Sequence, residues 1–164
     1  MSTTALRWYV AHTRPRCEKK LAQYCRRKEF QVTLPCYRSV RKYRGKTLVF
    51  EKVLFPSYLF LQLLVEQASH VRQHQYLANL LTVVDQQQFE EQLGAILQAL
   101  DSEVEVVLAP HISEGKLVRI KSGPLRGMEG FVQSREGHTH VLLRLDFIRQ
   151  AAAVKMDATE VELV

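Results

Sequence analysis

The sequence predicts an α+β protein, in which an N-terminal α/β sandwich precedes a small all-β barrel. In roughly the first hundred residues, runs that alternate every second residue are interspersed with segments that repeat apolar side chains at helical spacing. From Gly115 onward only short alternating runs remain, and glycine-containing turns separate them. Because 46% of the 164 residues are hydrophobic and 24% are charged, the chain is expected to be globular.

The first two elements are expected to be a strand and a basic helix. Residues Arg7–Thr13 alternate between two faces. Thr13 and Pro15 supply an N-cap candidate and a first-turn proline, so a helix is expected from there to about Lys28. Many of its outward side chains are basic, among them Arg14, Arg16, Lys19 and Lys20.

A second strand is expected at Phe30–Leu34, and a β-hairpin follows it. Cys36–Val40 and Thr47–Val53 flank a tip that has Gly45 at the turn. Four of the six tip residues are basic, namely Arg41, Lys42, Arg44 and Lys46. Tyr37 and Tyr43 interleave these charges, and they either stack on nucleic-acid bases or pack within the strands.

The N-terminal unit is organised around the stretch Phe55–Leu63. Pro56 has no N–H for a sheet ladder, so it marks the start of a strand. One face of this strand carries three leucines and suits packing under helices, whereas the other carries Tyr58 and Phe60. These two aromatic residues belong either to an ordinary core or to a surface for a partner.

The remainder of this unit is expected to add a short helix near Gln67–His74, a strand at Leu80–Val84 and a third helix. Asp85 caps the third helix, whose apolar face holds Phe89, Leu93, Ile96, Leu97 and Leu100. The result is a mostly antiparallel sheet with about three helices. We place this domain at residues 1–102, a linker of low periodicity at 103–112, and the small β-barrel at 113–164.

Charge is distributed unevenly along the chain. Residues 1–52 contain 14 Lys and Arg against 3 Asp and Glu, although the net charge of the whole chain is only +6. A basic block of this kind is typical of a surface that faces a polyanion, most often nucleic acid, and the alternative is a merely solvated face.

Several function classes find no support in the residues. The three cysteines lack metal-ligand spacing and are expected to be packing groups in a reducing cytoplasm. No paired-carboxylate, nucleophile–base or phosphate-loop arrangement is present, so we expect neither enzymatic activity nor a metal or cofactor. No apolar run approaches the roughly 20 residues that span a bilayer, and no secretory signal is seen, so we expect a cytoplasmic protein without membrane contact.

Two motifs point to a family. The stretch Gly115–Val132 resembles a KOW motif, and Arg7-Trp8-Tyr9-Val10, followed by a helix and then by Leu54–Phe60, resembles the NGN domain. In this order they resemble the NusG family of transcription elongation factors over nearly the whole chain. The sequence of Phe55–Phe60 is similar to the corresponding motif of the specialised RfaH, UpxY and LoaP antiterminators. One departure is that Val84-Asp85-Gln86 runs on without the Gly- or Pro-containing loop of the family.

This resemblance implies a monomeric antitermination factor that binds the clamp helices of the largest RNA polymerase subunit. The family's polymerase-binding positions correspond to Tyr58, Phe60 and His12. The basic helix and hairpin would then face the non-template strand or the upstream DNA. Phe147 and Ile148 correspond to the loop that contacts a small-subunit ribosomal protein or the termination factor Rho. Alternation leaves them in a turn, where they are either exposed for binding or, for Phe147, tucked in against the barrel. Because ribosomal proteins also carry KOW motifs, a ribosome-associated RNA-binding protein is the alternative.

Overall fold

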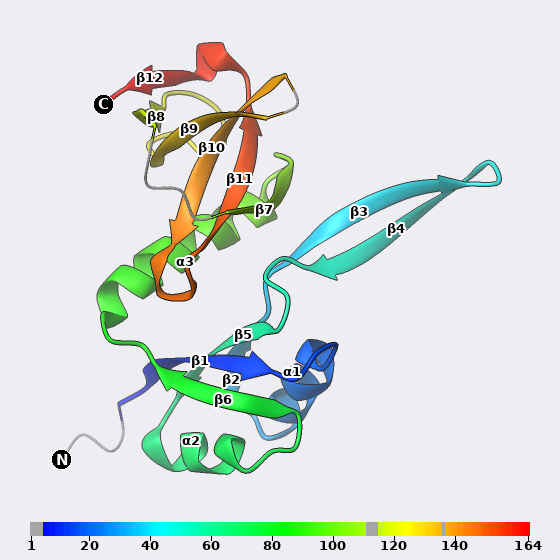
Figure 1. Cartoon of the computed structure of the whole chain (residues 1–164), viewed down its shortest axis with the longest axis vertical. Coiled ribbons are helices and arrows are strands. Elements are labelled where there is room, and N and C mark those ends of the chain that lie inside the picture. The colour runs from blue at the N-terminus through cyan, green and yellow to red at the C-terminus, as the bar shows by residue number, and fades with distance from the viewer. Residues whose placement is uncertain (1–4, 111–114, 136) are drawn as a thin grey trace. The chain divides into compact units, whose positions relative to one another are not determined.

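The computed structural model describes residues 5–110, 115–135 and 137–164, and it divides into two compact units after Gln87 (Figure 1). The first unit contains, in order, β1 (Arg7–Thr13), α1 (Glu18–Arg27), β2 (Gln31–Thr33), β3 (Cys36–Tyr43), β4 (Lys46–Val53), β5 (Tyr58–Leu63), α2 (Val65–Arg72) and β6 (Leu77–Thr82). The second contains nearly all of α3 (Gln86–Asp101) and then β7 (Val106–Pro110), β8 (Leu117–Ile120), β9 (Glu129–Arg135), β10 (His138–Leu145), the 3-10 turn η1 (Asp146–Ile148), β11 (Gln150–Met156), the 3-10 turn η2 (Ala158–Glu160) and β12 (Val161–Leu163).

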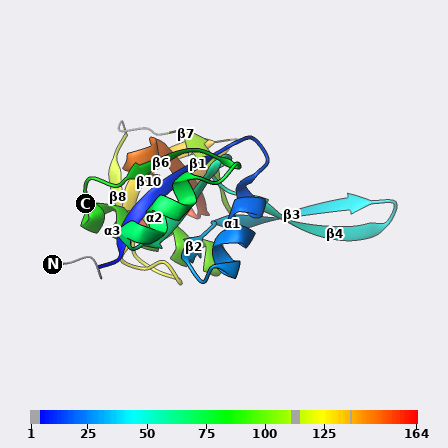
Figure 2. The same cartoon turned by 90° about the horizontal axis from the view of Figure 1, so that it is seen from below.

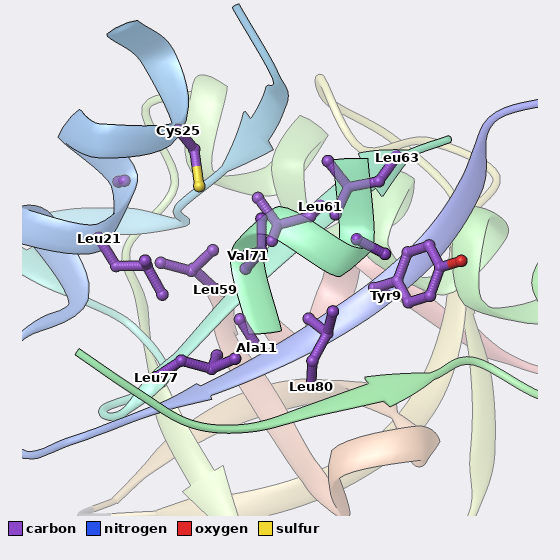
Figure 3. Close-up of a cluster of buried hydrophobic side chains, with 12 residues drawn as sticks. Tyr9, Ala11, Leu21, Cys25, Leu59, Leu61, Leu63, Val71, Leu77 and Leu80 are labelled. Atoms are coloured by element: carbon purple, nitrogen blue, oxygen red, sulfur yellow. The ribbon is translucent and has the colours of Figure 1, made fainter. Parts of the chain in front are cut away.

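The first unit is built on a four-stranded sheet with the order β2-β5-β1-β6, in which every neighbouring pair is antiparallel. Its helix-side face carries the three leucines of β5, which pack with Tyr9 and Ala11 of β1 and with Leu21 and Cys25 of α1 (Figure 3). Val71 of α2 completes this core. The alternation that the sequence predicts for Arg7–Thr13 and for Tyr58–Leu63 is therefore confirmed.

Helix α1 begins later than the sequence predicts. The first helical residue is Glu18 and the N-cap position is Cys17, which makes no side-chain capping bond. Arg16 has a left-handed backbone with a φ of 62°, which no helix residue can adopt, so the turn at Thr13–Arg16 lies outside the helix. Thr13 instead ends strand β1.

The hairpin β3–β4 is separate from the main sheet and projects from the first unit as a two-stranded ribbon (Figures 1 and 2). Its strands run farther than expected, so that only Arg44 and Gly45 remain in the turn. Both have a positive φ, at 49° and 78°, which is the requirement of a type I′ turn. This turn twists in the same sense as the strands, and it therefore allows the ladder to continue to the tip.

The second unit holds an antiparallel six-stranded sheet with the order β12-β8-β9-β10-β11-β7, which confirms the predicted all-β character of this region. Gly130 allows the close approach of β9 and β10, since an added Cβ would collide with the Leu142 carbonyl oxygen. Residues 106–110 of the expected linker form β7 and pair with β11. Residues 111 and 112 of that linker, and the expected domain start at Ser113, lie outside the described residues.

Candidate functional site

The sheet face opposite the helix-side core carries a stacked aromatic pair. The antiparallel register sets His12 of β1 directly across from Tyr58 of β5. Their ring centroids lie 5.1 Å apart with an interplanar angle of 29°. Both side chains are partly exposed, so they are accessible to a partner.

The third residue predicted for this surface, Phe60, lies deeper. It pairs with Val10, is fully buried, and meets the Phe55 ring edge-on at a centroid distance of 6.1 Å. Such edge-to-face contacts favour a fixed ring orientation. A partner can therefore contact His12 and Tyr58 directly, whereas the side chain of Phe60 is buried and out of its reach.

A buried carboxylate positions the start of β5. Ser57 has a left-handed backbone with a φ of 69°, and its N–H donates a 2.8 Å hydrogen bond to Oε2 of Glu18. Its carbonyl oxygen accepts a second 2.8 Å bond from the N–H of Thr13. Glu18 is only 8% exposed and lies in the first turn of α1, where the helix dipole favours a negative charge. The helix and the two strands are thus tied together immediately beside Tyr58.

The basic side chains in the turn before α1 and in its first turn are exposed, but three of them have defined contacts. Nε of Arg14 donates a 2.8 Å bond to the carbonyl oxygen of Gln75, which fixes the turn before β6. Nζ of Lys19 donates a 3.0 Å bond to the carbonyl oxygen of Glu51 in β4, and Nζ of Lys20 lies 5.5 Å from the centroid of the Tyr76 ring. Arg16, between Arg14 and this helix turn, is also exposed.

The hairpin carries the second set of basic residues that the sequence predicts. Arg41 and Lys42 lie in β3 and Lys46 in β4, whereas Arg44 is in the turn and its guanidinium carbon lies 5.4 Å from the centroid of the Tyr43 ring. All four are exposed. The contact of Lys19 with the backbone of β4 links this hairpin to the basic part of α1.

The predicted ribosomal-protein or Rho loop is more enclosed than expected. Ile148 is 9% exposed, and Phe147 is partly buried, with its ring edge-on to Phe89 of α3 at 6.3 Å. The side chain of Gln92 bonds both the backbone N–H and Oδ2 of Asp146 at 2.9 Å. Within the second unit, α3 therefore packs on this turn and removes much of the exposure that alternation implies.

Two of the three thiols, those of Cys25 and Cys36, are not activated. Burial raises the pKa of Cys25 to about 11, with a smaller opposing effect of Arg26, and burial and Glu51 also raise the pKa of Cys36. A raised pKa keeps a thiol protonated and weakly nucleophilic near neutral pH. Among the residues that the structure describes, no group of three His, Cys, Asp or Glu side chains could hold a metal ion. Within the same residues, no helix has the length and apolar character needed to cross a membrane.

Comparison with known proteins identifies the family. Residues 6–93, more than half of the chain, match the family model described as "Transcription termination factor nusG". The chain belongs to the NusG family. A solved structure described as "Domain interaction in Thermotoga maritima NusG" has the same fold, with a TM-score of 0.55, 20% sequence identity and coverage of 99% of each chain. No curated protein matches the sequence. NusG proteins are non-enzymatic transcription factors that bind RNA polymerase, and this membership assigns the chain to transcription.

Sequence reasoning missed Glu18 as a residue that positions the site. The available signal is that Glu18 is the only acidic residue of a helix that is otherwise basic or neutral. Its role depends on contact with Ser57, which is 39 positions away, so spacing within the helix does not reveal it.

We predict that Glu18→Ala lowers the free energy of unfolding by about 1–3 kcal/mol, because the partly buried Ser57 N–H loses its acceptor. Chemical denaturation of the full chain measures this change. The matched control is Glu90→Ala on the exposed side of α3, for which a change below about 0.5 kcal/mol is expected. Equal effects of the two substitutions would contradict the positioning role of Glu18.

Proposed function

We propose that this NusG-family protein binds the clamp helices of the largest RNA polymerase subunit and keeps the enzyme in a processive, antiterminating state. The observation that carries the proposal is the stacked, partly exposed His12–Tyr58 pair at one end of the two central strands of the first unit's sheet. Aromatic side chains that present a rigid surface commonly dominate the energetics of an interface. His12 and Tyr58 would make the contact, and Phe60 would hold Tyr58 in position.

The specialised type of factor is the more specific part of the proposal. The sequence of Phe55–Phe60 supports it, whereas the direct passage from β6 into α3 without a Gly- or Pro-containing loop is a departure from the family pattern. In that passage, the side-chain amide of Gln86 donates hydrogen bonds to the carbonyl oxygens of Trp8 and Val83, which ties the start of α3 to β1.

DNA is the second proposed partner. The basic start of α1 and the basic hairpin would face the non-template strand or the upstream duplex of the transcribing polymerase. Lysine and arginine contacts to phosphates supply affinity with little sequence selectivity. A protein that follows polymerase over any sequence requires this type of binding.

The third proposed partner is a small-subunit ribosomal protein or Rho at the turn η1. Phe147 is the accessible apolar residue of this turn, since Ile148 is largely buried. Because Phe147 contacts Phe89 of α3, a partner that covers Phe147 has to compete with that contact.

We predict that Tyr58→Ala weakens binding to RNA polymerase by about 1–3 kcal/mol, the range for loss of an aromatic anchor. Stability should fall by less than the roughly 3–5 kcal/mol of a core Phe→Ala substitution. Pull-down and titration with the polymerase of the source organism measure the binding. Tyr24→Ala, which truncates a half-buried tyrosine on the helix side of the sheet, is the control. Comparable losses for both variants would show that Tyr58 acts only through stability, and recovery of ribosomal particles without polymerase would favour the ribosome-associated alternative.

We predict that replacing Arg14, Arg16 and Lys20 with Gln lowers affinity for forked DNA and makes its salt dependence shallower. Each lost phosphate contact removes about 0.7–0.9 from the slope of log affinity against log salt. The matched control carries the same change of charge at the other end of α1, in Arg26, Arg27 and Lys28, all of which are exposed. If the two triple variants shift the slope equally, the positive charge acts only as a diffuse field.

We predict that Phe147→Ser abolishes contact with the ribosomal protein or Rho and leaves polymerase binding unchanged. Surface plasmon resonance with purified ribosomal protein, Rho and polymerase measures each of these affinities. The control is Leu163→Ser, which removes an equally apolar side chain that is 67% exposed on β12. If the Phe147 variant still binds the ribosomal protein and Rho as the wild type does, the turn is not their binding site.

A further inference from the structure

The register of the β3–β4 hairpin sorts its side chains into two different faces. Directly paired residues point to the same side of a two-stranded ribbon. Tyr37 pairs with Lys52, Ser39 with Phe50, Arg41 with Leu48 and Tyr43 with Lys46, and these eight residues form what we call the aromatic face. The opposite face holds the pairs Cys36–Val53, Arg38–Glu51, Val40–Val49 and Lys42–Thr47. All three aromatic residues of the hairpin therefore lie on one side.

The two faces also differ in charge. The aromatic face has three basic residues, Arg41, Lys46 and Lys52, and no acidic residue. On the opposite face, Glu51 lies across from Arg38, and Lys42 is the other basic residue. Positive charge without a compensating carboxylate thus coincides with the aromatic rings.

Folding of the hairpin does not account for these rings. Tyr43 is 61% and Phe50 46% exposed, and a two-stranded ribbon has no core in which to bury them. None of the three rings lies across from another aromatic or a β-branched residue, which are the pairings that stabilise a ladder. Large exposed apolar side chains that are gathered on one surface indicate a partner.

The arrangement of the rings matches a single-stranded nucleic acid. Phe50 pairs with Ser39, so the rise of a β-strand puts it roughly 7 Å along the ribbon from Tyr37 and roughly 13 Å from Tyr43. Proteins that hold single strands combine such a row of aromatic platforms, on which successive bases stack, with basic groups along the phosphates. A duplex hides the faces of its bases, so it cannot use the rings.

We propose that the aromatic face of the β3–β4 hairpin is a stacking platform for single-stranded nucleic acid. The proposal rests on the proposed function, because it specifies which nucleic acid the basic surface takes. Tyr43 and Phe50 stack on unpaired bases, and Arg41, Lys46 and Lys52 neutralise the adjoining phosphates. Binding is tolerant of sequence, since every base has a face on which a ring can stack.

The test measures fluorescence anisotropy of a labelled oligothymidylate of about 12 nucleotides, and of a duplex of equal length, with the full chain over a range of salt. Tyr43→Val with Phe50→Val removes both exposed rings and keeps residues that favour strands. We expect at least about a tenfold loss of affinity for the single strand and an unchanged salt slope, because stacking releases no counterions. Affinity for the duplex should change little.

Three further variants separate the causes. Val40→Thr with Val49→Thr alters the exposed apolar pair of the opposite face and should leave affinity for the single strand unchanged. Tyr43→Phe keeps the ring and should bind like the wild type. Arg41→Gln should make the salt slope shallower by about 0.7. Circular dichroism establishes that each variant is folded, and Tyr43→Val alone serves as the test if the double variant is not.

Several results would overturn the proposal: no binding of the single strand by the wild type, undiminished binding by the folded ring variant, or equal losses for single strand and duplex. An equal loss on substitution of Val40 and Val49 would also overturn it, because the loss of affinity would then not be specific to the aromatic face. Retrieval of polymerase by the wild-type chain, measured in parallel, keeps this outcome separate from the proposed function. If the wild-type chain binds polymerase but not the single strand, only the proposed stacking platform is refuted. If it binds the single strand but not polymerase, only the proposed polymerase binding is refuted.

Discussion

The antiparallel register between β1 and β5 is the constraint on which the first unit depends. It sets Ala11 across from Leu59 on the face that the helices cover, and by the same step it sets His12 across from Tyr58 on the other face. A slip of one residue would exchange the two faces and move the leucines of β5 out of the core. The aromatic pair is therefore held by the same free energy of apolar burial that holds the fold.

The turn before β5 shows how this register is held at its end. Ser57 adopts a left-handed conformation that costs a non-glycine residue roughly 1–3 kcal/mol. The bonds to Glu18 and from Thr13 offset that cost, and they join the first turn of α1 to both strands. The helix that carries much of the positive charge is consequently rigid with respect to the His12–Tyr58 pair. The proposed polymerase and DNA contacts would then lie on one surface of fixed geometry.

The hairpin follows a different physical rule. Its side chains bury little area, so its conformation depends on the backbone ladder, the type I′ turn and two contacts at its base. These are the bond between the N–H of Leu54 and the carbonyl oxygen of Pro35, and the contact of Lys19 with Glu51. Because no core constrains its side chains, both faces are free to serve recognition. The concentration of rings and uncompensated charge on one of them has its explanation in binding rather than in stability.

The sequence by itself determined the α+β class, the two faces of strands β1 and β5, the glycine turn of the hairpin and the motifs of the NusG family. Each depends on neighbours along the chain, which strand alternation and turn residues report directly. The tertiary structure alone decided that α1 starts at Glu18, that residues 106–110 pair with β11, and that Phe60 and Ile148 are buried. It also decided that Phe50 joins Tyr37 and Tyr43 on one face. The hairpin register follows from the two-residue turn, whereas the other features arise from contacts between segments that are distant in the sequence. Short-range periodicity does not report which of those segments meet.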